Sequence, residues 1–313
     1  MLKSDTTKLK SYSSDHSTSP PIIHMPRAFN AAHDLLERNI LAGRSKKIAY
    51  IDDAGRYTYE ELIARANQSG NAFLKLGLNI EDRIMIVHSD TVDFPAVFLG
   101  AIKVGVVPIA VNTLLTPDDY EFMLEDSRAK ALIVTSSLME KLDRAISKSK
   151  YLQHIIVSGD ELSGYHNLQR LQSLASDECD PAVTSCDDSC FWLYSSGSTG
   201  APKGTIHVHS SLAHTAELYA KPVLGIKETD VVFSAAKLFF AYGLGNGLTF
   251  PLSVGATTVL MAERPTPDSV FKRLKEHQPT IFYGVPTLFG AMLASDHLPN
   301  RSEVSIRVAT SAG

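Results

Sequence analysis

Short apolar runs alternate with segments of helical character along most of this chain, and this alternation constrains the fold more than any other feature. The runs are rich in β-branched and aliphatic residues, and the intervening segments have the length and start signals of helices. The predicted strands lie at 83–88, 106–111, 131–135 and 154–157, and again at 231–235, 257–261, 280–283 and 305–310. Strands separated by helices in this way predict parallel sheets covered on both faces. We therefore expect an α/β protein with two stacked parallel-sheet subdomains.

A polar connector divides the two runs of strands and predicts the subdomain boundary. It lies near residues 160–188, which places the subdomains at about 47–165 and 188–313. The connector also holds the three cysteines of the chain, at positions 179, 186 and 190. Their spacing matches no zinc or redox pattern, so we expect three reduced thiols and no metal site.

The charge and hydropathy of the chain argue against nucleic-acid and membrane partners. Its 313 residues carry a net charge of −4, which indicates no basic surface for nucleic acid. No apolar run reaches the roughly 18 residues of a membrane-spanning helix. Residues 1–24 are polar and lack the apolar core of a secretory signal. We expect a disordered N-terminus and a cytoplasmic protein.

A glycine-rich segment that follows an apolar run predicts an anion-binding loop. The run ends at Tyr194, and most of the next ten residues are Gly, Ser or Thr. Glycines let successive N–H groups turn toward one cluster of oxygens, hydroxyls add donors, and a lysine adds positive charge. The predicted phosphate-binding residues are Ser195, Ser196, Gly197, Ser198, Thr199, Gly200, Lys203 and Gly204.

The spacing inside this loop separates it from three familiar loops. A Walker A loop needs Gly-Lys-Ser/Thr, whereas Lys203 lies between Pro202 and Gly204. The dinucleotide fingerprint Gly-x-Gly-x-x-Gly is absent from this segment. A hydrolase elbow centred on Ser198 has Ser196 where glycine is required. An amidase-type serine enzyme stays open as an alternative, although no lysine base is identifiable.

The string Tyr194-Ser-Ser-Gly-Ser-Thr-Gly-Ala-Pro-Lys-Gly204 resembles the phosphate loop of the adenylate-forming superfamily, which includes acyl- and aryl-CoA synthetases, adenylation domains and luciferases. Segments at 57–62, 82–83 and 105–112 resemble further parts of that family in the same order. The resemblance extends from about Phe29 to the end of the chain. It implies that residues 25–313 are an AMP-binding (adenylation) domain.

Within the superfamily, two segments resemble the benzoate-CoA ligase group. They are residues 237–246, Lys-Leu-Phe-Phe-Ala-Tyr-Gly-Leu-Gly-Asn, and residues 282–286, Phe-Tyr-Gly-Val-Pro. The resemblance implies that both line the pocket for the carboxylic acid, where aromatic walls and small residues would form a narrow slot for a flat ring. The predicted pocket residues are Phe240, Ala241, Tyr242, Gly243, Tyr283 and Gly284.

The resemblance implies a reaction in two steps. An aromatic carboxylate attacks the α-phosphate of Mg-ATP to give an acyl-adenylate, and the thiol of coenzyme A then displaces AMP. The implied substrates and cofactors are therefore ATP, Mg²⁺, coenzyme A and a benzoate-like acid. His207, His209 and His214 follow the loop, and we assign them no catalytic role.

The family pattern continues beyond the last predicted strand. The resemblance implies that Ser311, Ala312 and Gly313 open the adenine-binding turn. It also implies that the barrel subdomain, the Thr/Glu segment and the C-terminal domain with the catalytic lysine are absent from these 313 residues. We expect an N-terminal fragment with impaired activity. Two alternatives stay open: a truncated non-catalytic protein that binds nucleotide or a partner, and a synthetase for a non-aromatic acid.

Overall fold

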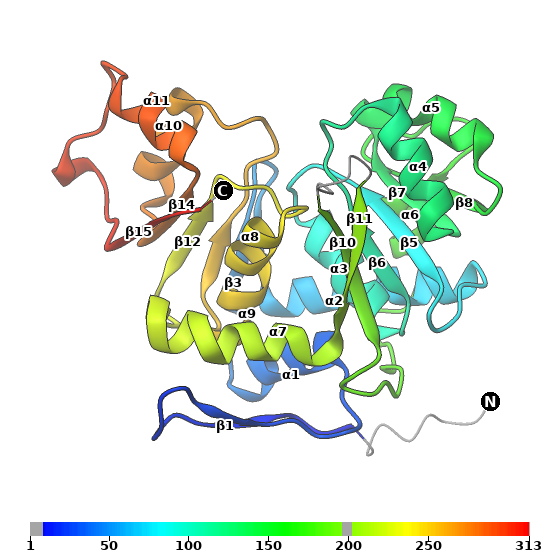
Figure 1. Cartoon of the computed structure of the whole chain (residues 1–313), viewed down its shortest axis with the longest axis horizontal. Helices are drawn as coiled ribbons and strands as arrows, with labels where there is room; N and C mark the ends of the chain where they lie inside the picture. Colours follow the sequence, from blue (N-terminus) through cyan, green and yellow to red (C-terminus); the bar gives the residue numbers. More distant parts are fainter. Residues whose placement is uncertain (1–8, 196–201, 313) are drawn as a thin grey trace.

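The chain folds into two β-sheets that lie side by side, with helices between them and on their outer faces (Figure 1). This computed structural model describes residues 9–195 and 202–312. A short hairpin of β1 (Ser13–Asp15) and β2 (Ile22–His24) runs along the lower edge of the molecule in Figure 1.

The first sheet has seven strands, and its central strands are parallel. In spatial order they are β11 (Lys203–Val208), β10 (Ser189–Ser195), β6 (Val107–Ala110), β5 (Arg83–Val87), β7 (Ala131–Thr135), β8 (His154–Ser158) and β9 (His166–Asn167). Residues of β6 are all buried, as expected for a parallel strand covered on both faces. Among the described strands of this sheet, β11 alone runs antiparallel, paired with β10 at the edge.

The second sheet has six strands, and all but the edge strand β4 pair in parallel. In spatial order they are β15 (Val308–Ser311), β14 (Ile281–Gly284), β12 (Val231–Ser234), β13 (Thr257–Val259), β3 (Ile48–Ile51) and β4 (Arg56–Thr58). The predicted α/β class with two parallel-dominated sheets is confirmed.

The largest core lies between the sheets. Helices α2 (Tyr59–Lys75) and α3 (Asp93–Lys103) lie in this space, α1 (Ala31–Leu41) packs against them from below in Figure 1, and α3 is buried along its whole length. Helices α2 and α3 approach closely at Gly100, where a Cβ atom would lie 2.4 Å from the Ala66 carbonyl oxygen. A larger residue at position 100 would therefore push the two helices apart.

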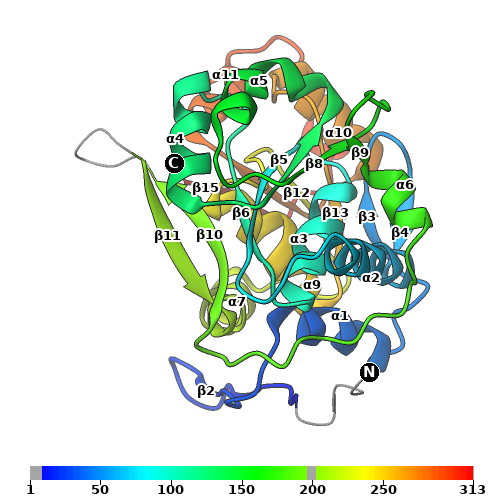
Figure 2. The ribbon, with the colours of Figure 1, turned by 90° about the vertical axis from the view of Figure 1, so that its right-hand side faces the viewer.

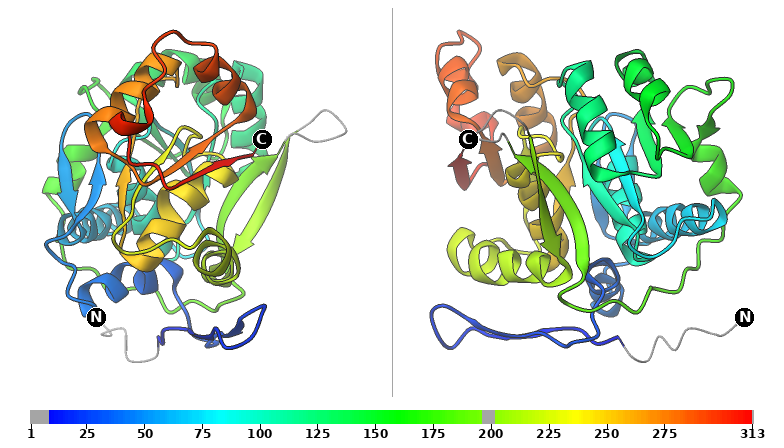
Figure 3. Two further views of the ribbon diagram at one scale, coloured as in Figure 1. Left: turned by 90° about the vertical axis from the view of Figure 1, so that its left-hand side faces the viewer. Right: turned by 45° about the vertical axis from the view of Figure 1, so that its right-hand side comes forward.

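The outer faces of the sheets are covered by separate helix pairs. The outer face of the first sheet is covered by α4 (Pro117–Ser127) and α5 (Met139–Lys148), and α6 (Leu168–Ser173) follows β9 (Figure 2). That of the second sheet is covered by α10 (Pro267–His277) and α11 (Pro286–Leu293) (Figure 3). Strand alternation divides the side chains, since Val232 packs in one apolar cluster and Phe233 in another on the opposite face.

The sheets correct the expectation of consecutive subdomains at about 47–165 and 188–313. Strands β3 and β4 precede the first sheet in sequence, yet β3 pairs with β13 of the second. Strands β10 and β11 follow the connector, yet β10 pairs with β6 of the first. The hydrophobic pattern predicts strands but not their neighbours, because any buried parallel strand can pair with any other of similar length. Each sheet thus contains strands from both halves of the sequence.

The N-terminal segment also differs from its expectation. Of residues 1–24, which were expected to be disordered, those from 13 to 24 form the β1–β2 hairpin. Tyr12 precedes it and is buried, and its hydroxyl donates a 2.6 Å hydrogen bond to Glu217. Composition alone does not predict that this segment is ordered. The order depends on the contact of buried Tyr12 with the buried carboxylate of Glu217, which is distant in sequence.

Two helical stretches contain π-helical turns. One runs through α7 (His209–Thr215) into a π-helix at Ala216–Leu224. The other runs through α8 (Ala241–Leu244), a π-helix at Gly245–Thr249 and α9 (Phe250–Val254). Short 3₁₀ turns occupy Ser136–Leu138 and Arg301–Glu303.

Two sequence expectations concern covalent and membrane features. The three cysteines are free thiols, as predicted, and two of them, Cys186 and Cys190, are buried. Within residues 9–195 and 202–312, no helix combines the length and apolar character needed to cross a membrane.

Candidate active site

The predicted phosphate loop connects two paired strands at the edge of the first sheet. Strands β10 and β11 pair in antiparallel register, with Ser195 opposite Lys203 and Tyr194 opposite Gly204. Ser195 and Lys203 are exposed where the hairpin ends. The remaining predicted residues, Ser196, Gly197, Ser198, Thr199 and Gly200, lie outside the described residues. The hairpin therefore presents the first serine and the lysine of the loop side by side.

One hydrogen bond and close aromatic packing restrain the two residues that flank the loop, Tyr194 and Gly204. The Tyr194 hydroxyl donates to Asp126 on α4 at 2.6 Å. Burial raises the pKa of Tyr194 well above its usual range, and the bond to Asp126 adds to this rise. At Gly204 a Cβ atom would lie 3.1 Å from the Trp192 ring, so glycine allows the strands to pack closely. Both ends of the loop thus start from fixed positions.

The predicted acid-binding segment begins α8 and is partly open to solvent. Phe240 is 47% exposed and packs against Phe239, with ring centroids 4.6 Å apart. Ala241 is exposed as well. The glycine positions correct one detail of the predicted slot. A Cβ at Gly243 would lie 1.9 Å from the Lys237 carbonyl oxygen, and one at Gly284 would lie 2.7 Å from the Phe289 ring. Protein atoms therefore fill the room that these glycines provide.

Two tyrosines predicted to share the pocket contact each other. The rings of Tyr242 and Tyr283 pack edge to face, with centroids 6.3 Å apart. The Tyr242 hydroxyl shares a 2.6 Å hydrogen bond with the hydroxyl of Thr310 on β15. Tyr283 is fully buried, and its hydroxyl has no hydrogen-bond partner among residues 9–195 and 202–312. Sequence reasoning missed Thr310, which becomes visible only when β15 pairs beside β14.

The predicted adenine side lies directly beside the acid-binding segment. Ser311 ends β15 and pairs with Gly284, and the Ala312 N–H donates to the Gly284 carbonyl oxygen at 3.4 Å. Gly313 lies outside the described residues. The carboxyl ends of neighbouring parallel strands are where open α/β sheets bind ligands. In the views of Figures 1 and 3, these strand ends and the end of the β10–β11 hairpin lie along the same side of the molecule.

The histidines after the loop make packing contacts. The His207 ring stacks on Phe191, with centroids 4.5 Å apart. His209 is buried, and its Nδ1 accepts a hydrogen bond from the Ala31 N–H at 3.1 Å. Burial lowers the pKa of His209 to about 4, so its imidazole is neutral near pH 7. Among residues 9–195 and 202–312, no three His, Cys, Asp or Glu side chains gather in a way that could hold a metal ion.

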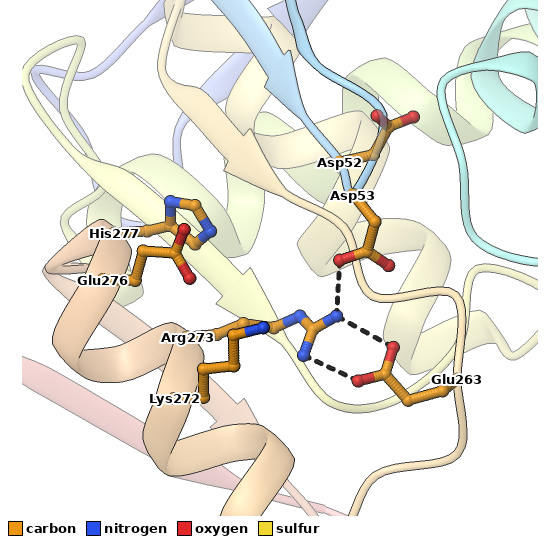
Figure 4. A pocket seen from close by; sticks show the side chains of 7 residues that line it. All are labelled: Asp52, Asp53, Glu263, Lys272, Arg273, Glu276 and His277. Atoms are coloured by element: carbon orange, nitrogen blue, oxygen red, sulfur yellow. Dashed lines mark hydrogen bonds and ion pairs between the residues drawn. The ribbon is translucent and has the colours of Figure 1, made fainter.

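A cavity of about 400 Å³ with a charged lining lies beside the loop after β13, where Lys237 of the predicted acid-binding segment contacts the lining residue Glu263 (Figure 4). Its residues are Asp52, Asp53, Glu263, Lys272, Arg273, Glu276 and His277. Arg273 binds Glu263 in bidentate fashion, at 2.7 and 2.8 Å, and also binds Asp53 at 2.6 Å. These paired charges fasten α10 to the loop after β13, and no residue predicted to bind substrate lines the cavity.

Comparison with known proteins places this arrangement in a family. The family described as AMP-binding enzyme matches residues 36–313. The chain belongs to the AMP-binding enzyme family. This confirms the resemblance inferred from the loop between Tyr194 and Gly204.

Two relatives of this chain are named as ligases of aromatic acids. The chain is 58% identical to a benzoate–CoA ligase of Thauera aromatica, over 96% of this chain and 56% of that protein. It is 45% identical to a 4-hydroxybenzoate–CoA/benzoate–CoA ligase of Rhodopseudomonas palustris, over 92% of this chain and 53% of that protein. The chain thus spans about half the length of these relatives.

Solved structures share the fold. A benzoate CoA ligase from Burkholderia xenovorans LB400 matches with a TM-score of 0.85 and 52% identity, over 91% of this chain and 56% of that chain. The anthranilate CoA ligase AuaEII, solved with anthranoyl-AMP, matches with a TM-score of 0.89 and 34% identity, over 92% of this chain and 55% of that chain.

Proposed function

We propose that this chain forms the ATP- and acid-binding part of a ligase that converts a benzoate-like acid into its CoA thioester. The observation that carries the proposal is the 58% identity to a benzoate–CoA ligase over 96% of the chain. The geometry supports it, because the aromatic segment around Tyr242 and the strand end at Ser311 are neighbours across β14 and β15. The proposed site of the reaction in the cell is the cytoplasm.

The first step is an in-line displacement at phosphorus. A carboxylate oxygen of the acid forms a bond to the α-phosphate of Mg-ATP, and the bond to pyrophosphate breaks. Ser195 and Lys203 would bind the outer phosphates as negative charge moves onto the leaving pyrophosphate. Ser196, Gly197, Ser198, Thr199, Gly200 and Gly204 would complete this cradle. Mg²⁺ enters as part of the Mg-ATP substrate.

The second step transfers the acyl group to sulfur. The thiol of coenzyme A attacks the carbonyl carbon of the acyl-adenylate, loses its proton and displaces AMP. This chain would hold the acid during that attack. Phe240, Ala241 and Tyr242 would face the ring from α8, while Gly243 would support the α8 turn beneath it. Tyr283 and Gly284 would bound the site from β14, and Ser311 at the end of β15, followed in sequence by Ala312 and Gly313, would meet the adenylate.

The test is benzoate-dependent exchange of pyrophosphate into ATP by the full-length gene product that contains this chain. We expect exchange with benzoate and with ring-substituted benzoates, and weak exchange with acetate, because a small aliphatic acid leaves the aromatic walls unfilled. Strong preference for acetate would overturn the aromatic assignment. Absence of exchange with every acid would overturn the ligase assignment.

A further inference from the structure

The backbone just before the acid-binding segment is held by a carboxylate from the other sheet. Leu238 is 1% exposed, and its N–H donates to both carboxylate oxygens of Asp90, at 3.3 and 3.2 Å. Asp90 is itself buried, and it follows β5 of the first sheet. Leu238 follows β12 of the second sheet. This interaction therefore joins the two sheets two residues before Phe240.

The ammonium group of the neighbouring Lys237 binds backbone carbonyl oxygens of the loop after β13. Its Nζ donates to the Glu263 carbonyl oxygen at 2.7 Å and to the Ala262 carbonyl oxygen at 3.4 Å, and it also contacts that of Met261. Burial lowers the pKa of Lys237, while the charge of Asp90 raises it in part. The side chain thus points toward the loop after β13 and not toward Phe240.

The receiving loop is itself fixed. Glu263 forms the bidentate ion pair with Arg273, whose side chain is only 6% exposed (Figure 4). Arg273 also binds Asp53, which follows β3. The guanidinium is buried while the Glu263 side chain is 48% exposed, and the two parallel hydrogen bonds fix the orientation of one group against the other. The carbonyl oxygens that bind Lys237 therefore have set positions.

These restraints pass directly into the acid-binding turn. The Lys237 carbonyl oxygen accepts the Phe240 N–H at 3.0 Å, and the Phe240 carbonyl oxygen accepts the Leu244 N–H at 2.7 Å. The absence of a side chain at Gly243 lets α8 pack on that same Lys237 carbonyl. A shift at positions 237 and 238 would consequently move Phe240 and the first turn of α8 together.

We propose that Asp90 and Lys237 are positioning residues for the aromatic acid, acting from opposite sides on the backbone that carries Phe240. The inference rests on the proposed function, since the acid site is defined there. Neither side chain belongs to the phosphate hairpin of β10 and β11. Their effect is therefore specific to the acid and leaves ATP binding unaffected.

The test compares Asp90→Asn, Lys237→Met and the double variant in the full-length gene product, using steady-state kinetics with benzoate and ATP varied in turn. Asparagine keeps an acceptor for the Leu238 N–H, so the fold is retained while the charge is lost. We expect each single variant to raise the KM for benzoate about tenfold or more, with the KM for ATP unchanged. We expect the double variant to lose less than the product of the single effects, because it leaves no lone buried charge.

A matched control removes the same types of charge from an exposed ion pair, using Glu125→Gln and Lys150→Met, whose side chains are 44% and 77% exposed. These variants should behave as wild type. An unchanged KM for benzoate in folded Asp90→Asn and in the double variant would overturn the inference, and so would an equal rise in both KM values. If the wild type does not turn over benzoate at all, the proposed function is wrong. That result differs from an unchanged KM for benzoate in the variants, which would contradict the inference alone.

Discussion

At the scale of single residues, the proposed phosphate binding depends most directly on Lys203. Its place opposite Ser195 at the hairpin end puts an exposed ammonium group beside the first loop hydroxyl. The residue type and its spacing were readable from the sequence, because a phosphate cradle depends on local composition. The Tyr242–Thr310 and Asp90–Leu238 contacts were not, because their partners are 68 and 148 positions apart in the chain. These contacts depend on the order of the strands in the two sheets, which the sequence pattern does not give.

Replacement of Lys203 tests the phosphate assignment. We expect Lys203→Ala to lower benzoate-dependent pyrophosphate exchange about 100-fold, because one charged donor to the leaving group is lost. Thermal unfolding should be unchanged, since the side chain is exposed. Lys150→Ala serves as the control, as this lysine is also exposed. Exchange at the wild-type rate in Lys203→Ala would remove the hairpin from the mechanism.

At the same scale, Tyr12 tests the order of the N-terminal segment. Its hydroxyl donates to Glu217, whose side chain is fully buried and also binds Lys221. We expect Tyr12→Phe to lower the free energy of unfolding by about 1–2 kcal/mol, because a hydrogen bond to a buried charge is lost. Urea titration measures this change, and Tyr165→Phe, at a residue 38% exposed, is the control. Equal midpoints for both variants would show that the hydrogen bond from Tyr12 to Glu217 contributes nothing to stability.

At the scale of elements, α7 is fastened to α1 by His209. The Ala31 N–H donates to Nδ1, which requires an unprotonated nitrogen, and burial lowers the pKa of this histidine from 6.5 to about 4. The native state therefore binds fewer protons than the unfolded state between these values. This contribution to stability is complete above about pH 6.5 and is lost as the pH falls toward 4.

The corresponding variant is His209→Asn, which keeps an acceptor for the Ala31 N–H and has no proton to gain. Thermal midpoints measured from pH 7 to pH 4 should fall less steeply in the variant than in the wild type. His297→Asn is the control, because the His297 side chain is 78% exposed. Parallel curves for wild type and His209→Asn would contradict the assigned role of His209 as a buried neutral acceptor.

At the scale of the whole molecule, the fold class followed from the strand and helix pattern, whereas the arrangement of the sheets did not. The runs around Ile51 and Val259 each predict a strand, but nothing local states that β3 and β13 are neighbours. The adjacency of Gly284 and Ser311 has the same origin. The proposed acid and adenine segments were thus predicted separately, and the pairing of β14 with β15 that brings them together is a consequence of the tertiary fold.

The most direct test of the account is a crystal structure of the full-length gene product with a non-hydrolysable benzoyl-adenylate analogue. We predict that the aromatic ring lies against Phe240 and Tyr242, with Tyr283 packed behind Tyr242, and that the adenine lies beside Ser311 and Ala312. Side chains of Asp90 and Lys237 should remain on the backbone atoms of Leu238 and Glu263 without touching the analogue. A ring bound elsewhere, for example in the charged cavity around Arg273, would contradict the assignment of the acid site.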